Sequence, residues 1–317
     1  MTNWVYPLGT ATDGKWDISI GTSDSSLAVE GWAHTGLKVA ALPAGADVVL
    51  PAADEERIVV PLTGSFTVTV DGAEYQLNGR PSVFHGPSDV LYSGTGREVS
   101  ISSAGGGRVA VATAPASASY PTRLVTAAET PVELRGAGNC SRQVHNFGTP
   151  AALEADRFIV CEVLTPAGNW SSYPPHKHDE EKDGETHLEE IYYFETRVAA
   201  GSAAPADADA IGYQRVYASD ERPIDVSAEV RTGDVVLVPY GWHGPAMAAP
   251  GYDLYYLNVM AGPGPERVWR ICDDPAHAWV RDTWPDQPID PRLPMHPDPE
   301  GERQRAGGRG SGSGGMP

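Results

Sequence analysis

The sequence predicts an all-β fold with two jelly-roll β-barrels in one chain and few short helices. Short β-prone runs separated by turn residues follow one another along both halves of the chain. The 317 residues include 35 Gly and 28 Pro, which favours strands and turns over long helices. A chain of this length is expected to form two domains or one two-lobed domain.

The first half begins with an arm, residues 1 to about 25, and continues as short strands to about residue 114. Asp71-Gly72 stands between two such runs, and Asp-Gly in this position is typical of a two-residue hairpin turn. The runs 57–61 and 65–70 are expected to be separate strands. We expect residues 1–115 to form the N-terminal barrel.

The most informative stretch lies in the second half and starts with a His-x-His pair. His176 and His178 are two residues apart, so in a strand both imidazoles point to one face. A polar loop leads from them to a second, aromatic strand that carries Glu189 and Glu190. Two imidazoles and a carboxylate are a ligand set that suits Zn, Mn, Fe or Ni.

A fourth candidate ligand, His243, follows a Gly-Asp turn, an apolar strand and a Pro-x-Gly turn. His-x-His, Glu and then Gly-(x)5-Pro-x-Gly-x-His resembles the two-part motif of the cupin superfamily. That resemblance implies that the four groups converge inside one barrel around a metal. The alternative is a cupin that keeps the barrel without a metal.

The first half repeats this pattern without its ligands. Arg57 stands where the ligand Glu would be, and no His-x-His precedes it. Phe84-His85-Gly86-Pro87 only faintly resembles Trp242-His243-Gly244-Pro245. We therefore expect an N-terminal barrel that lacks metal ligands.

The remaining segments complete the expected organisation. Residues 116–150 should form a crossover between the halves, and residues 151–297 the metal-binding C-terminal barrel with a segment that wraps a barrel or a partner subunit. The Gly-, Ser- and Arg-rich residues 298–317 lack apolar anchors and are expected to be disordered.

Charge and cysteine content limit the partners and the compartment. The chain has 23 Lys and Arg against 42 Asp and Glu, a net charge of −19, which argues against binding to nucleic acid or an anionic membrane. Its three cysteines show no CxxC spacing, and neither a signal peptide nor an apolar membrane span is predicted. We expect a cytoplasmic protein, and the sequence leaves a homo-oligomer open.

Several longer motifs resemble one enzyme family more closely than cupins in general. They are Ser171 to Glu180, Leu188 to Tyr193, Gln214 to Tyr217, Gly233 to Pro239 and Tyr252 to Gly262. All five resemble the 5-deoxy-glucuronate isomerase family of myo-inositol catabolism, a bicupin family related to 4-deoxy-5-ketouronate isomerase. The resemblance covers the chain to about residue 279. It implies aldose–ketose isomerisation of 5-deoxy-D-glucuronate to 5-dehydro-2-deoxy-D-gluconate.

The resemblance also implies one divalent metal (Zn, Mn or Fe) on His176, His178, Glu190 and His243. Only one of Glu189 and Glu190 can face inward, because side chains alternate along a strand. In related cupins the ligand Glu directly precedes an aliphatic residue and then aromatics, which favours Glu190, followed by Ile191 and two tyrosines. This register would place Tyr192 and Phe194 inside with Glu190.

The resemblance leaves the acid–base group and the carboxylate-binding residue open. The candidates for the base are a metal-bound hydroxide, Tyr193 and Glu189. Arg215 and Arg142 are the candidates to bind the carboxylate of a sugar-acid substrate, because Arg offers a bidentate grip. Lys177 lies between the two histidines and should point away from their face.

Two other functions remain compatible with the same fold. A metal held by three His and one Glu would also suit an Fe(II) dioxygenase. A non-catalytic sugar-binding cupin is the third possibility.

Overall fold

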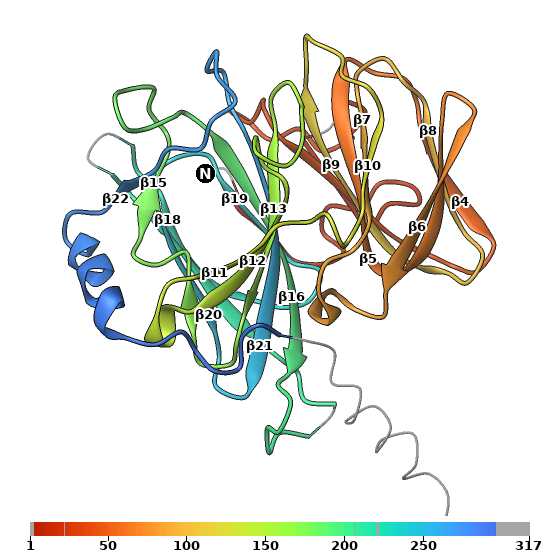
Figure 1. Ribbon diagram of the computed structural model, residues 1–317. Coiled ribbons are helices and arrows are strands. Elements are labelled where there is room, and N and C mark those ends of the chain that lie inside the picture. The colour runs from red at the N-terminus through yellow and green to blue at the C-terminus, as the bar shows by residue number, and fades with distance from the viewer. Residues whose placement is uncertain (1–2, 22, 206, 220–221, 296–317) are drawn as a thin grey trace, which may run out of the picture.

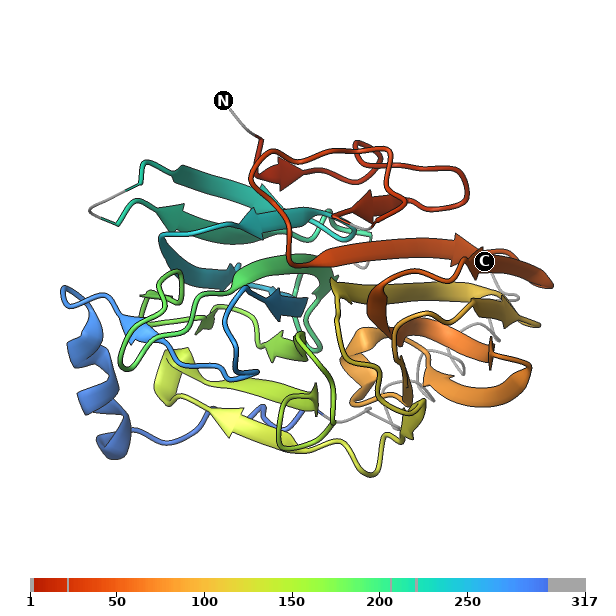
Figure 2. The same cartoon turned by 90° about the horizontal axis from the view of Figure 1, so that it is seen from above.

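The computed structural model describes residues 3–21, 23–205, 207–219 and 222–295. Within these ranges the chain forms 22 strands in three sheets and three 3-10 helices, which confirms the all-β prediction. The N-terminal half, red to yellow, and the C-terminal half, green to blue, lie side by side in both views (Figure 1, Figure 2).

One curled sheet of nine strands makes up the first half. The turn at Asp71-Gly72 has φ of 50° and 82°, both positive as a tight hairpin of this kind requires, and it joins β5 to β6 as predicted. The strands are β2 (Ile18–Ile20), β3 (Gly36–Leu42), β4 (Ala46–Leu50), β5 (Glu55–Val70), β6 (Ala73–Arg80), β7 (Val90–Ser93), β8 (Val99–Ser103), β9 (Gly107–Pro115) and β10 (Arg123–Val125). The helix η1 (Val83–His85) lies between β6 and β7.

The expectation of two separate strands at 57–61 and 65–70 is wrong, because both runs belong to the 16-residue strand β5. The pairing register shifts between Pro61 and Thr63 against β9, and between Gly64 and Phe66 against β6. Gly64 has φ of 83°, so the strand bends through bulges instead of ending.

Two sheets make up the second half. The seven-stranded sheet runs β1 (Val5–Tyr6), β19 (Val235–Val238), β16 (Glu189–Val198), β21 (Tyr252–Ala261), β13 (Ile159–Thr165), β12 (Arg142–Gly148), β11 (Val132–Arg135). The six-stranded sheet runs β18 (Asp225–Val230), β17 (Gly212–Tyr217), β20 (Trp242–Ala248), β15 (His176–Lys177), β22 (Cys272–Asp273), with β14 (Trp170–Ser171) also paired to β20.

Two short strands cross the expected domain boundaries. β1 of the N-terminal arm pairs with β19 of the second half, and β10 of the crossover pairs with β7 of the first. The division into 1–115, 116–150 and 151–297 therefore stays a proposal about folding units, and the described structure is intertwined at both boundaries.

The apolar core has three parts, and the seven-stranded sheet borders two of them. One cluster fills the first half, with residues such as Val68 and Ile101, and a second fills the space between the two sheets of the second half. A third cluster joins the halves and contains Ile58, Tyr193 and Leu257. The two faces of β16 and β21 are therefore both buried, one against the first half and the other inside the second.

Buried polar contacts accompany this apolar interface. Arg80 of β6 forms two hydrogen bonds of 2.7 Å with Glu162 of β13, and Arg108 of β9 pairs with Glu195 of β16 at 2.5 Å. Glu56 accepts backbone N–H bonds of 2.7 and 2.8 Å from Arg157 and Phe158. Such an interface holds the halves in a fixed relation.

The C-terminal segment runs along the second half. The helix η3 (Ala278–Asp286) lies at its outer end, away from the first half (Figure 1, Figure 2), while Leu293 and Met295 pack into the cluster between the halves. The helix η2 (Gly138–Cys140) lies between β11 and β12. The expected disordered tail, 298–317, lies outside the described residues. None of the helices in the described part of the chain is long and apolar enough to cross a membrane.

Candidate metal centre

The four predicted ligands come from the two facing sheets of the second half. His176 on β15 lies directly opposite His243 on β20 in the six-stranded sheet. Glu190 lies on β16 of the seven-stranded sheet, and His178 follows β15 directly. All four side chains are buried, each with no more than 7% exposure.

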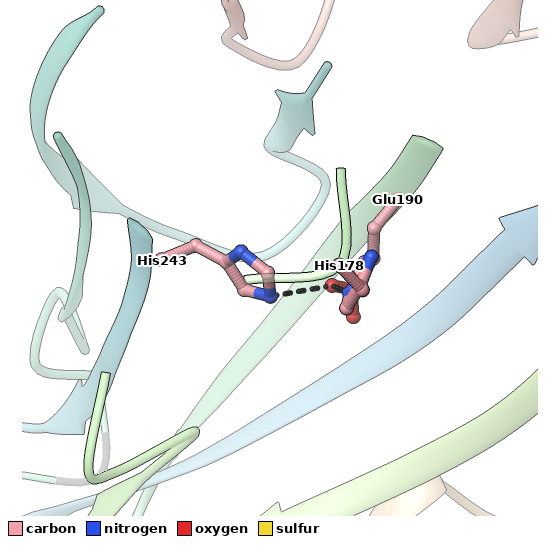
Figure 3. Close-up of side chains that lie close together, drawn as sticks. All are labelled: His178, Glu190 and His243. Atoms are coloured by element: carbon pink, nitrogen blue, oxygen red, sulfur yellow. Dashed lines mark hydrogen bonds and ion pairs between the residues drawn. The ribbon is translucent and has the colours of Figure 1, made fainter. Parts of the chain in front are cut away.

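Three of the four ligands converge on one point (Figure 3). Glu190 Oε2 lies 3.1 Å from His178 Nε2 and 3.0 Å from His243 Nε2. The ligand atoms of these three residues lie within 4.8 Å of one another. His176 borders the group, with its ring centroid 4.6 Å from that of His243.

The backbone orients each imidazole. Nδ1 of His176 lies 3.1 Å from the carbonyl of Pro174, Nδ1 of His178 lies 3.1 Å from that of Leu188, and Nδ1 of His243 lies 3.3 Å from that of Gly241. Since a carbonyl oxygen only accepts, each Nδ1 carries the proton in these contacts and leaves the Nε2 lone pair free to bind a metal.

The buried polar atoms of the cluster fit a divalent transition metal. Glu190 Oε1 is fully buried and has no hydrogen-bond partner, while the Nε2 atoms of His178 and His243 both face Glu190 Oε2. Buried polar atoms are normally paired, and an unpaired one is a sign of a missing ion or ligand. Imidazole nitrogens with one carboxylate oxygen match the ligands that Zn, Mn and Fe accept in proteins.

Burial and charge act in opposite directions on these groups. Burial alone would raise the pKa of Glu190, but the adjacent His178 and His243 outweigh it and hold that pKa below its ordinary value. Burial and the two neighbouring imidazoles lower the pKa of His176 well below its usual range. Burial would also lower the pKa of His178, but the contact with Glu190 raises it. The cluster thus favours an ionised carboxylate beside a neutral His176.

A buried ionic network holds the turn at Gly241, which leads into β20 and His243. Lys177 Nζ donates to Asp179 at 2.8 Å and to Glu185 at 2.9 Å, so it points away from the histidines as expected. Asp179 also accepts a 2.9 Å bond from the backbone N–H of Gly241, two residues before His243. The network thereby connects β15, which carries His176, to the start of β20, which carries His243. The Lys177 ammonium group lies among the carboxylates of Asp179, Glu180 and Glu185.

Glu189 and Tyr193 lie on the opposite face of β16, toward the first half. The Glu189 carboxylate accepts backbone N–H bonds from Ala33 at 2.9 Å and from His34 at 2.7 Å. The Tyr193 hydroxyl donates to Glu195 at 3.1 Å within the region between the halves. The structure does not bring either proposed acid–base residue to the histidine cluster.

A cavity of about 230 Å³ opens beside the cluster. It is smaller than the ~300–1,000 Å³ typical of sites for drug-sized ligands, so it suits a small metabolite. The lining residues include His176, Glu190, Arg135, Arg142, Arg281, Ser172, Tyr192, Tyr256, Asn258 and Trp269. Positive and hydroxyl groups thus surround the space next to the candidate metal centre.

Of the two predicted carboxylate-binding residues, only Arg142 lines this cavity. Arg142 is 5% exposed, its guanidinium carbon lies 5.6 Å from the ring centroid of Trp284, and its guanidinium donates to the Cys140 carbonyl at 3.0 Å.

 Burial lowers the pKa of Arg142 to about 10, so the guanidinium is still charged at neutral pH. No carboxylate pairs with it among the described residues, in contrast to Arg281, which binds Asp273.

Arg215 lies on the outer side of β17. Its guanidinium pairs with Asp225, which is 84% exposed, and donates to the carbonyls of Val216 and Val226. Alternation along β17 instead points Gln214 inward, where it is buried. Arg57 of the first half is also paired: its guanidinium forms an ion pair with Glu55 at 3.0 Å and donates to the carbonyl of Pro51 at 2.6 Å.

Tyr192, Ser172 and Tyr256 were not among the predicted site residues. The predicted register did place Tyr192 inside with Glu190, but it gave Tyr192 no role. Ser172 and Tyr256 carry no comparable local signal, since the contact between them joins residues 84 positions apart.

The chain is similar to known proteins over most of its length. A family model described as the KduI/IolB family matches residues 4–280. Two relatives named 5-deoxy-glucuronate isomerase, from Geobacillus kaustophilus (strain HTA426) and Bacillus subtilis (strain 168), are 41% and 38% identical to the chain. The alignments cover 80% and 82% of this chain, and 88% and 90% of the two relatives.

Two solved structures share the fold of this chain. The crystal structure of an IolB-like protein from Salmonella typhimurium LT2 has a TM-score of 0.77 and 35% identity, covering 88% of this chain and 99% of that chain. An oxalate decarboxylase from Lactobacillus farciminis has a TM-score of 0.57 at 12% identity, covering 86% of this chain and 89% of its own, and shares the fold alone.

Proposed function

The chain belongs to the KduI/IolB family, and we propose that it is a 5-deoxy-glucuronate isomerase that holds one divalent transition metal on His176, His178, Glu190 and His243. The observation that carries the proposal is the convergence of His178, Glu190 and His243 within 4.8 Å, beside a cavity lined by an unpaired arginine.

The reaction is an aldose–ketose isomerisation, in which a hydrogen moves from C2 to C1 of the sugar acid. A metal bound at this centre would polarise the carbonyl oxygen and stabilise the negative charge that develops on the substrate oxygens. The protein supplies the ligands, keeps three imidazoles oriented through their Nδ1 contacts, and encloses the reacting carbons in a small cavity.

Arg142 is proposed to bind the carboxylate at the other end of the substrate. It is charged, buried and unpaired, and a planar guanidinium can form two parallel hydrogen bonds with a carboxylate. Holding the substrate at both ends fixes its reacting carbons relative to the ligand cluster, which accelerates a reaction by orientation. Arg215 has a weaker claim because its own carboxylate partner lies on the outer surface.

We also propose a cytoplasmic location, since Cys140, Cys161 and Cys272 are all free thiols. A homo-oligomer remains a proposal that light scattering on the purified protein would test.

The decisive experiment follows turnover directly. Purified protein is incubated with 5-deoxy-D-glucuronate, with and without a chelator, and the ketone product is followed by NMR. The proposal expects conversion to 5-dehydro-2-deoxy-D-gluconate that the chelator abolishes and added divalent metal restores. Oxygen consumption in the same assay would instead favour the Fe(II) dioxygenase, and binding without turnover would favour the sugar-binding cupin.

A further inference from the structure

Three hydroxyl groups form a connected chain in the wall of the cavity. Ser172 Oγ lies 3.1 Å from the Tyr192 hydroxyl and 3.2 Å from the Tyr256 hydroxyl, so the serine bridges the two tyrosines. The tyrosine rings also contact each other, with centroids 5.0 Å apart. All three residues are at most 7% exposed, and all three line the cavity beside Glu190.

The backbone around Ser172 is built to place its hydroxyl. Ser172 has φ of 47°, in the left-handed region that non-glycine residues rarely adopt. Its carbonyl packs closely against Gly244, where a Cβ would lie only 1.8 Å from that oxygen. A residue kept in such a conformation by tight surroundings is a reason to look for a role in function.

The three hydroxyls have more O–H donors than the hydrogen bonds among them use. Three hydroxyls carry three O–H donors and can each accept as well. The two links through Ser172 use two of these donors, which leaves one O–H for a neighbouring acceptor, either Glu190 or a bound substrate. Tyr192 lies beside the candidate metal centre, because it shares the inner face of β16 with Glu190 and its ring centroid lies 6.3 Å from that of His243.

We propose that Tyr192, Ser172 and Tyr256 form a hydroxyl subsite for the reacting end of the sugar acid, in which Tyr192 donates to the oxygen that gains negative charge. This inference rests on the proposed isomerase function and adds a catalytic residue to it. The Tyr192 hydroxyl donates a hydrogen bond to that oxygen and keeps its own proton. Ser172 and Tyr256 are positioning residues that hold the Tyr192 hydroxyl in place.

The strands themselves offer a matched control. Tyr255 precedes Tyr256 on β21 but lies on the opposite face, where its hydroxyl donates to Glu162 at 2.7 Å. Tyr192→Phe, Tyr256→Phe and Ser172→Gly each remove one hydroxyl of the subsite, and Ser172→Gly also suits the left-handed backbone. Tyr255→Phe removes a buried hydroxyl outside it.

Each variant is measured for kcat and KM on 5-deoxy-glucuronate, bound metal, thermal midpoint and the Kd of D-glucuronate. We expect Tyr192→Phe to lower kcat about 100-fold with its metal content unchanged, the size of effect seen when one donor to a developing oxyanion is lost. Tyr256→Phe and Ser172→Gly should weaken glucuronate binding about fivefold, as for one lost hydrogen bond. Tyr255→Phe should keep kcat within about threefold of the wild type.

Three results would overturn the subsite: a Tyr192→Phe enzyme with kcat within about threefold of the wild type, a Tyr192→Phe protein that has lost its metal, or an equal loss of kcat in Tyr255→Phe. A wild type that does not convert 5-deoxy-glucuronate would instead refute the proposed function. In that case the Kd of D-glucuronate tests the subsite. The subsite is refuted if the wild type does not bind D-glucuronate, or if Tyr256→Phe and Ser172→Gly bind it as tightly as the wild type.

Discussion

Glu189 and Glu190 are neighbours in β16, yet their carboxylates serve different parts of the molecule. Glu190 Oε2 lies 3.1 Å from His178 Nε2, while Glu189 accepts the backbone N–H of His34 at 2.7 Å. The alternation of side chains in a strand separates them, because the two faces of β16 border two different interiors.

Exchanging each carboxylate for an amide should therefore give two different defects. Glu190→Gln should lose metal and activity together, because only neutral imidazoles would remain around a dication. Glu189→Gln should keep its metal but lose about 1–3 kcal/mol of unfolding free energy, as expected when charged hydrogen bonds to backbone N–H groups are weakened. Elemental analysis and urea denaturation of both variants measure these effects, and a metal-free Glu189→Gln would contradict the assignment.

The metal content of the wild type is a separate prediction. We expect close to one transition metal per chain after purification without chelator, held by the second half alone. In the first half the sequence pattern predicts Arg57 at the place of the ligand Glu, and this arginine pairs with Glu55 at 3.0 Å. Metal analysis of the Glu190→Gln variant provides the control, since a second site in the first half would leave metal behind.

Arg142 and Arg215 make a matched pair for testing substrate charge. Arg142→Lys should raise KM roughly 10- to 100-fold, because a point charge replaces the planar fork that grips a carboxylate. Arg215→Lys should stay within about twofold of the wild type, since its partner Asp225 is 84% exposed and surface ion pairs contribute little. Steady-state kinetics of the two variants decide the question, and a larger rise in KM for Arg215→Lys would reverse the assignment.

Acid should weaken the contact between the two halves through Glu162. Burial alone would raise the pKa of Glu162, but Arg80 outweighs it and lowers that pKa to about 2, from an ordinary value of 4.5. Because the folded pKa is the lower one, Glu162 stabilises the fold fully above pH 4.5 and loses this contribution as the pH falls from 4.5 toward 2. Urea denaturation at a series of pH values across this window should show the loss.

Glu162→Gln should remove most of this acid dependence and cost about 3–5 kcal/mol at neutral pH, since it leaves Arg80 buried without its counter-charge. Glu229→Gln serves as the control, because Glu229 pairs with Arg231 at the surface, where both are more than 40% exposed. A Glu162→Gln variant with the same acid profile as the wild type would show that other groups control the acid response.

Local patterns in the sequence were enough to predict the β-fold, the hairpin at Asp71-Gly72 and the four proposed metal ligands. Strand alternation and the spacing of His176 and His178 act over a few residues, and the choice of Glu190 over Glu189 follows from the resemblance of the residues after it to those of related cupins. The bulges that keep β5 continuous were missed, because Gly64 indicates a turn as readily as a bulge until its strand partners are known.

Only the tertiary structure decided what each strand face meets. The outer face of β16 carries Tyr193 against the first half, and nothing near Tyr193 in the sequence indicates that partner. Arg142 and Arg215 are equally polar strand residues, and they differ because one borders the cavity and the other faces outward. Ser172 joins Tyr192 and Tyr256 across separations of 20 and 84 residues, so their contact exists only in the folded chain.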